Sequence, residues 1–89
     1  MKCSVKITIE GRVQGVGFRY SAVEKANQFH ITGYITNNPD YSITIMAEGI
    51  EEELDEFIVW CYNGPPRALV TNVNITNIRQ QNYSKFVIR

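Results

Sequence analysis

Apolar and polar residues alternate along the first ten residues of the chain, which is the pattern of a strand with one buried face. The apolar set is Cys3, Val5, Ile7 and Ile9. Similar short runs predict strands at 33–37, at 43–47 and around 73–75, and the closing residues "FVIR" predict a short fifth strand. The turn signal "NPDYS" separates the second strand from the third.

Two other segments repeat their apolar residues at helical spacing. The first runs from about Tyr20 to His30, and its apolar positions are Ala22, Val23, Ala26 and Phe29. The second has apolar residues at i, i+3, i+4 and i+7, namely Leu54, Phe57, Ile58 and Cys61. Three glutamates at 51–53 precede this stripe and fall in the first turn of the predicted helix. Negative charge in the first turn stabilises a helix through its interaction with the helix dipole.

The order strand, helix, strand, strand, helix, strand is typical of a ferredoxin-like α+β sandwich, βαββαβ. It predicts one domain over residues 1–89, with an antiparallel sheet, two helices on one face and a short fifth strand at the end. The usual strand order puts the third strand between the first and the second. The first and second strands are then parallel to each other, so their carboxyl ends lie at the same end of the sheet.

The charge balance and the absence of long apolar runs exclude several classes of function. The 9 Lys and Arg residues balance 9 Asp and Glu residues, so the chain lacks the positive charge typical of proteins that bind nucleic acid or anionic membranes. No apolar run is long enough for a signal peptide or a membrane span. We therefore expect a cytoplasmic protein with no nucleic-acid or membrane partner, in which Cys3 and Cys61 are free thiols.

The segment "GRVQGVGFR", residues 11–19, lies between the first strand and the first helix and carries three glycines. Gly11, Gly15 and Gly17 permit unusual backbone conformations and close approach of a ligand, and a turn that enters a helix presents unpaired N–H groups. Arg19 adds a guanidinium that matches two phosphate oxygens. The alternative is a tight turn with the arginine in solvent. The spacing matches neither a Walker loop nor GxGxxG.

Together with "ITGYITN", "AEG" and "NGPPRA" downstream, the segment "GRVQGVGFRY" resembles the acylphosphatase family in order and spacing, over essentially the whole chain. Members of that family hydrolyse carboxyl-phosphate anhydrides without metal, cofactor or covalent intermediate, on the fold predicted above. The resemblance implies a hydrolase acting on a small-molecule acyl phosphate, with inorganic phosphate as product and inhibitor. It also implies a monomer.

The resemblance assigns roles to individual residues. The backbone of the loop should hold the phosphoryl group, and the loop consists of Gln14, Gly15, Val16, Gly17, Phe18 and Arg19. Arg19 should also bind the phosphoryl group through its side chain, and Asn37 should hold the attacking water. Asn38 competes for that role, but the spacing from Gly33 favours Asn37. Tyr20 could contact the substrate, although packing at the start of the helix is the preferred interpretation.

Two other protein classes are alternative interpretations of the sequence. A non-catalytic anion-binding module on the same fold would keep Arg19 and lose turnover. An RNA-binding ferredoxin-like domain would need aromatic residues on its central strands and a basic face. The first strand instead offers Ser4, Lys6 and Thr8 on its polar side.

The segment "CYNGPPR", residues 61–67, has the C-x5-R spacing of cysteine-dependent phosphatases. However, Cys61 lies on the apolar stripe of a helix, and Pro65 and Pro66 lack N–H donors. His30 stands where the family commonly ends the first helix with a left-handed glycine, so we expect a surface cap rather than a base. Tyr41 also stands at a usual glycine position, which puts the geometry of the hairpin turn in question.

Overall fold

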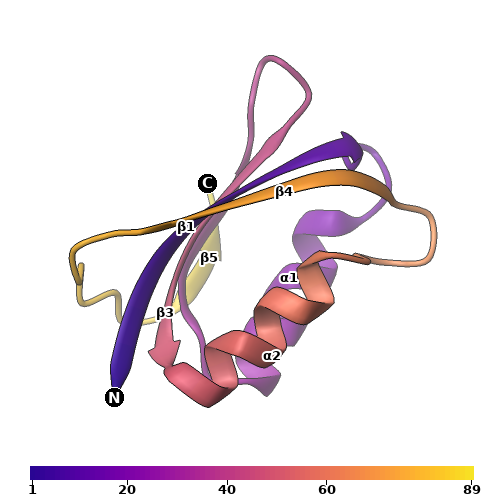
Figure 1. The fold of residues 1–89 in the computed structure, drawn as a ribbon. Helices are drawn as coiled ribbons and strands as arrows, with labels where there is room; N and C mark the ends of the chain where they lie inside the picture. The colour runs from indigo at the N-terminus through magenta and orange to yellow at the C-terminus, as the bar shows by residue number, and fades with distance from the viewer.

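The computed structural model describes residues 1–89 and contains the predicted elements in the predicted order (Figure 1). The elements are β1 (Lys2–Arg12), α1 (Phe18–Gln28), β2 (Thr32–Asn37), β3 (Ile43–Ile50), α2 (Glu51–Cys61), β4 (Leu69–Asn77) and β5 (Phe86–Ile88). The ferredoxin-like βαββαβ prediction is therefore confirmed, with a short strand at the end.

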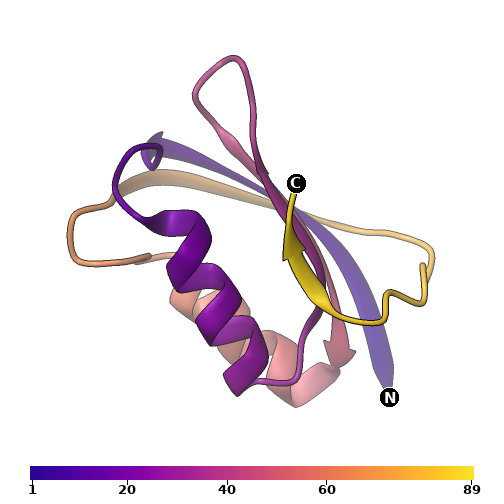
Figure 2. The same cartoon turned by 180° about the vertical axis from the view of Figure 1, so that it is seen from behind.

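The strands form one sheet in the order β4-β1-β3-β2-β5. β3 lies between β1 and β2 and is antiparallel to both, so β1 and β2 are parallel as predicted. β5 differs from the prediction of an antiparallel sheet, because it pairs parallel to β2. The reason is topological. β4 ends at the same end of the sheet at which β2 begins, and residues 78–85 cross from there to the opposite edge. The chain then runs along β2 in the direction of β2 (Figures 1 and 2).

Both helices cover the same face of the sheet, as predicted (Figures 1 and 2). The core lies between the two layers and takes alternate residues of each central strand together with one face of each helix. Its fully buried members are Ile7, Ile9, Ile35, Ile43, Ile45, Ala47, Ala22, Ala26, Phe57 and Cys61. The alternation seen in the sequence therefore identifies the inner face of the sheet correctly.

The two helices follow the predicted pattern with one shift in position. α1 begins at Phe18 and ends at Gln28, two residues earlier than the predicted start and end. The buried ring of Phe18 packs against Trp60 of α2, with ring centroids 5.3 Å apart, and so draws the helix start back to the glycine turn. No helix of the structure has the length and apolar character needed to cross a membrane.

The two residues at usual glycine positions take the left-handed conformation that a glycine would take. His30 has φ 58° after the end of α1, and its Nδ1 lies 2.7 Å from Oε2 of Glu53. Tyr41 has φ 73° and is 75% exposed. The turn is closed by the N–H of Asn38, which donates to the Ser42 carbonyl at 2.8 Å. The hairpin thus keeps its geometry despite Tyr41.

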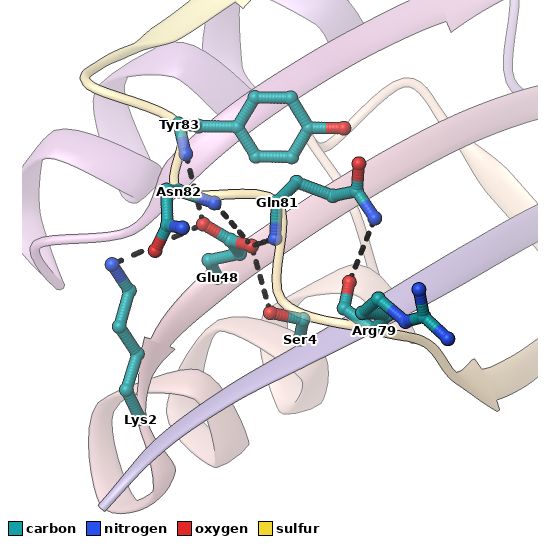
Figure 3. Close-up of polar contacts among 7 residues, drawn as sticks. All are labelled: Lys2, Ser4, Glu48, Arg79, Gln81, Asn82 and Tyr83. Atoms are coloured by element: carbon teal, nitrogen blue, oxygen red, sulfur yellow. Dashed lines mark hydrogen bonds and ion pairs between the residues drawn. The ribbon is translucent and has the colours of Figure 1, made fainter.

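The face of the sheet away from the helices is closed at one end by residues 78–85, which cover the side chain of Glu48 (Figure 3). Glu48 pairs with Ser4 across β1 and β3 and is 0% exposed. The Ser4 hydroxyl donates to Oε2 at 2.8 Å, and Lys2 Nζ lies 3.9 Å from Oε1. The alternating pattern had put Glu48 on the polar face of its strand, and the covering loop is what buries it.

Three successive backbone N–H groups also donate to the Glu48 carboxylate. Those of Gln81 and Asn82 reach Oε2, the latter at 3.0 Å, and that of Tyr83 reaches Oε1 at 3.0 Å. Burial raises the pKa of Glu48, but these hydrogen bonds and that from Ser4 favour the ionised form, so the pKa lies below its ordinary value. Glu48 thereby fixes residues 81–83 to the sheet as a charged anchor.

Candidate active site

The glycine-rich loop and Asn37 lie at the same end of the sheet, because the parallel strands β1 and β2 both end there. Between them is a cavity of about 210 Å³. Its lining residues are Val13, Gln14, Gly15, Gly17, Phe18, Arg19, Tyr20 and Asn37. The structure therefore brings together the loop, the arginine and the asparagine that the sequence singled out.

The backbone of the loop is shaped by two left-handed glycines, Gly15 with φ 74° and Gly17 with φ 82°. A Cβ atom on either glycine would have no atom beyond its chain neighbours within 4 Å, so packing does not require glycine at these positions. The backbone conformation does require it, since left-handed φ disfavours residues with a side chain. The absence of side chains also leaves the main chain open to a ligand.

Gly11 has a different role from the one suggested by its place in the motif. It belongs to β1, where the pairing with β4 shifts register between Glu10 and Gly11. A Cβ atom at Gly11 would overlap the carbonyl oxygen of Leu69. Gly11 does not line the cavity. It therefore permits close approach of two strands, and the expectation that it helps to form the anion site is wrong.

The loop presents a run of free backbone donors. None of the N–H groups from Gly15 to Tyr20 donates to a backbone carbonyl or to a side chain. Gly17 is the N-cap residue of α1, no side chain caps this helix end, and the first turn contains no acidic residue. These donors and the positive end of the helix dipole together favour an anion.

Arg19 is the only residue with a full charge in the cavity lining. Its side chain is half-buried, and no carboxylate lies within ion-pair distance of it. A guanidinium held in this way, with no carboxylate beside it, keeps its donors available for an anionic ligand. The one full charge in the cavity lining is therefore positive, which suits an anionic ligand.

Asn37 and its neighbour Asn38 are arranged very differently. Asn37, the last residue of β2, lines the cavity, and its Oδ1 is buried without a protein hydrogen-bond donor. Asn38 uses its Nδ2 inside the hairpin, donating to Ser42 Oγ at 2.9 Å and to Thr44 Oγ1 at 2.8 Å. The side chain of Asn38 is therefore committed to the turn, whereas that of Asn37 faces the loop and Arg19.

The side chain of Gln14 connects the loop to the hairpin that carries Asn37, a role that the sequence did not reveal. Its Nε2 donates to the carbonyl oxygens of Asn38 at 2.9 Å and of Ser42 at 3.0 Å. No spacing or motif signals this contact, because it links residues 24 and 28 positions apart. The contact holds the two halves of the cavity in a fixed relation.

The side chains of two further residues of the loop region lie in different environments. The side chain of Val16 is absent from the cavity lining and packs against the hydrophobic core. Tyr20 is 72% exposed and lines the cavity, so the preferred interpretation that it packs at the helix start is wrong. Sequence alone could not distinguish the two, since the direction of each side chain depends on how the loop and α1 pack on the sheet.

Cys61 and His30 lie away from the cavity. Cys61 is fully buried in α2, and burial raises the pKa of its thiol, so it lacks the access and the ionisation that a nucleophile needs. His30 follows the carboxyl end of α1, whereas the cavity lies at the amino end, roughly 15 Å away along the helix. The predictions that Cys61 lies on the buried face of α2 and that His30 takes a left-handed position after α1 are confirmed.

Comparison with known proteins agrees with this fold. The family sequence model described as Acylphosphatase matches residues 5–88. The acylphosphatase of Thermotoga maritima is 42% identical over 86 residues, which cover 97% of this chain and 96% of the relative.

Two solved structures are also similar. The crystal structure of acylphosphatase from Bacillus subtilis has a TM-score of 0.94 and 36% identity, and the alignment covers 100% of this chain and 99% of that one. The structure of an acylphosphatase from Coxiella burnetii has a TM-score of 0.95 and 34% identity, covering 99% and 93%. Similarity at this level, over nearly the whole length, shows that the chain belongs to the acylphosphatase family.

Proposed function

We propose that this acylphosphatase hydrolyses small acyl phosphates by direct attack of water on phosphorus. The oxygen of the water bonds to phosphorus as the bond from phosphorus to the acyl oxygen breaks. The electron pair leaves with the carboxylate, and the other product is inorganic phosphate. The backbone of residues 14–19 and the side chain of Arg19 hold the phosphoryl group, and Asn37 holds the water.

The cavity itself carries this proposal. Free N–H groups along the loop and the guanidinium of Arg19 offer donors to the equatorial phosphoryl oxygens, where charge spreads in the transition state. No carboxylate lines the cavity to compete with the substrate. Removal of one donor of this type typically reduces a rate by about 10²–10³.

The position of Asn37 supports its role toward water. Its amide lines the same cavity as Arg19 and the loop, and its Oδ1 has no protein donor. Turning an amide by 180° exchanges its oxygen and nitrogen, so the side chain can present either an acceptor or a donor to water. A water bound there lies beside the phosphoryl site, which favours attack through proximity.

The proposed reaction needs no strong general acid or base from the protein. The leaving group is a carboxylate of low pKa, which departs without a proton. The oxygens of the substrate phosphate can accept the proton from the water. Neither a histidine nor a carboxylate lines the cavity, in agreement with a mechanism that rests on positioning and charge stabilisation.

One experiment tests the proposal directly. Release of phosphate from benzoyl phosphate is measured with EDTA present for the wild type, Asn37→Ala and the matched control Asn74→Ala, which changes an exposed asparagine on β4. We expect metal-independent turnover in the wild type and control, and a loss of about 10²-fold or more in Asn37→Ala. Sedimentation of the same samples tests the expected monomer.

Other outcomes would contradict the proposal in distinct ways. Near-normal turnover in Asn37→Ala would remove the water-holding role from this residue. Binding of inorganic phosphate by the wild type without any turnover would identify a non-catalytic anion-binding module. Loss of activity with EDTA would contradict a metal-free reaction.

A further inference from the structure

A second and larger cavity lies in the groove between helix α1 and edge strand β5, which stand side by side in Figure 2. Its volume is about 540 Å³, within the range typical of small-molecule sites. Its lining residues, five of them hydrophobic, are Tyr20, Ser21, Val23, Glu24, Phe86, Val87 and Ile88. We refer to it as the α1–β5 groove.

The α1–β5 groove meets the anion cavity at Tyr20. This residue lines both cavities and is 72% exposed. Ile88, at the end of β5, pairs with Ile35, which stands two residues before Asn37 in the parallel strand β2. The amino end of α1 and the carboxyl end of β5 therefore bring one end of the groove to the site of the phosphoryl group.

The chemistry of the groove is the opposite of that of the anion cavity. Arg19 and free N–H groups surround the proposed phosphoryl site, whereas no lysine or arginine lines the groove. Its one acidic side chain, Glu24, is exposed and forms no ion pair. A neutral apolar group is favoured there by burial of apolar surface, and a second anionic group is disfavoured by repulsion from Glu24.

We propose that the α1–β5 groove binds the acyl group of the substrate and selects neutral, apolar acyl phosphates over those that carry a second negative charge. This inference rests on the proposed function of the anion cavity. An acyl phosphate joins an anionic head to a carbon chain, and the two adjoining cavities match these two parts. Tyr20 is the boundary between them.

The test compares three acyl phosphates as substrates. Acetyl phosphate has almost no acyl chain, butanoyl phosphate has an apolar chain, and succinyl phosphate has a chain of the same length that ends in a carboxylate. Acetate and butanoate are leaving groups of nearly equal basicity, so their difference reports binding of the chain. We expect KM to fall about fourfold for each methylene that the groove buries, and succinyl phosphate to bind less tightly than butanoyl phosphate.

The variant Glu24→Lys sharpens the test, because it reverses the one charge of the groove on an exposed helical position. We expect it to reverse the preference, lowering KM for succinyl phosphate relative to butanoyl phosphate about tenfold in low salt. The matched control Glu56→Lys makes the same charge change at an exposed position of α2, outside the groove. It should leave the preference as it is in the wild type.

The failures can be told apart. Equal KM values for all three substrates, unmoved by Glu24→Lys, would overturn the groove assignment and leave the hydrolase intact. Absence of hydrolysis for all three would overturn the proposed function and the groove assignment with it. A stable dimer in sedimentation that Glu24→Lys dissociates would assign the groove to a second copy of the chain instead of the acyl group.

Discussion

The two ends of the sheet both present backbone N–H groups to an anion, but only one end supplies the anion from its own sequence. At one end, the N–H groups of residues 81–83 donate to the buried carboxylate of Glu48. At the other end, the N–H groups of residues 15–20 have no protein acceptor, and no carboxylate lines the cavity. The same kind of donor thus stabilises the fold at one end and is kept available for a ligand at the other.

The comparison shows how one fold can separate stability from function. Glu48 is 0% exposed and its oxygens accept from several protein donors, so these donors are not left for a ligand. The cavity end relies on Gln14 to hold the loop against the hairpin, which leaves Arg19 and Asn37 uncommitted. A change at the Glu48 end should therefore affect stability alone, and a change at the cavity end should affect activity alone.

The largest effect is expected for Arg19→Ala. The variant removes the only fully charged group of the cavity, so kcat/KM should fall by about 10²–10³ and competitive inhibition by inorganic phosphate should be lost. Because Arg19 forms no ion pair in the protein, Tm should stay nearly constant. Arg67→Ala, an exposed arginine that belongs to the C-x5-R motif, is the control and should behave as the wild type. Unchanged phosphate inhibition in Arg19→Ala would contradict the site.

Glu48→Gln should give the opposite result. It replaces an acceptor-only carboxylate by an amide whose NH₂ group faces the N–H donors of residues 81–83, which leaves a buried polar group unsatisfied. We expect a loss of about 3 kcal/mol in the free energy of unfolding, which lowers Tm by more than about 10 °C. The folded enzyme should keep its kcat. Glu52→Gln, at an exposed position of α2, controls for the charge change.

The dependence of stability on pH gives a finer test of the same anchor. The pKa of Glu48 in the folded protein lies below its ordinary value of 4.5. Its contribution to stability is therefore full above pH 4.5 and is lost as the pH falls through the folded-state pKa. Urea unfolding of the wild type and Glu48→Gln at neutral pH and at several lower values should show the difference between them shrinking with acid. A constant difference would contradict the charged anchor.

The smallest effects are expected at two of the left-handed residues, His30 and Tyr41. Tyr41→Gly relieves the strain of φ 73° at an exposed position and should raise the free energy of unfolding by about 1 kcal/mol with kcat unchanged. His30→Gly should gain less, because it also removes the contact with Glu53. Thermal unfolding of both variants measures the two gains. A large loss of activity in His30→Gly would contradict its interpretation as a surface cap.

Much of the site could be predicted because its parts are local in sequence. Gly15, Gly17 and Arg19 lie within one short turn, and the alternation of β2 sets Asn37 at its carboxyl end. The roles of Gly11 and Tyr20 could not be predicted. The role of Gly11 depends on the close approach of β4 to β1. The role of Tyr20 depends on its exposed position on the side of α1 that faces β5.

By itself, the sequence determined the order of the elements, the inner face of the sheet and the glycine-rich turn followed by Arg19, because each depends on residues a few positions apart. Only the tertiary structure decided the parallel direction of β5, the link from Gln14 to the hairpin and the burial of Glu48. The Glu48 anchor joins residues more than thirty positions apart. No local pattern encodes such contacts, since they exist only after the strands have paired and the loop has crossed the sheet.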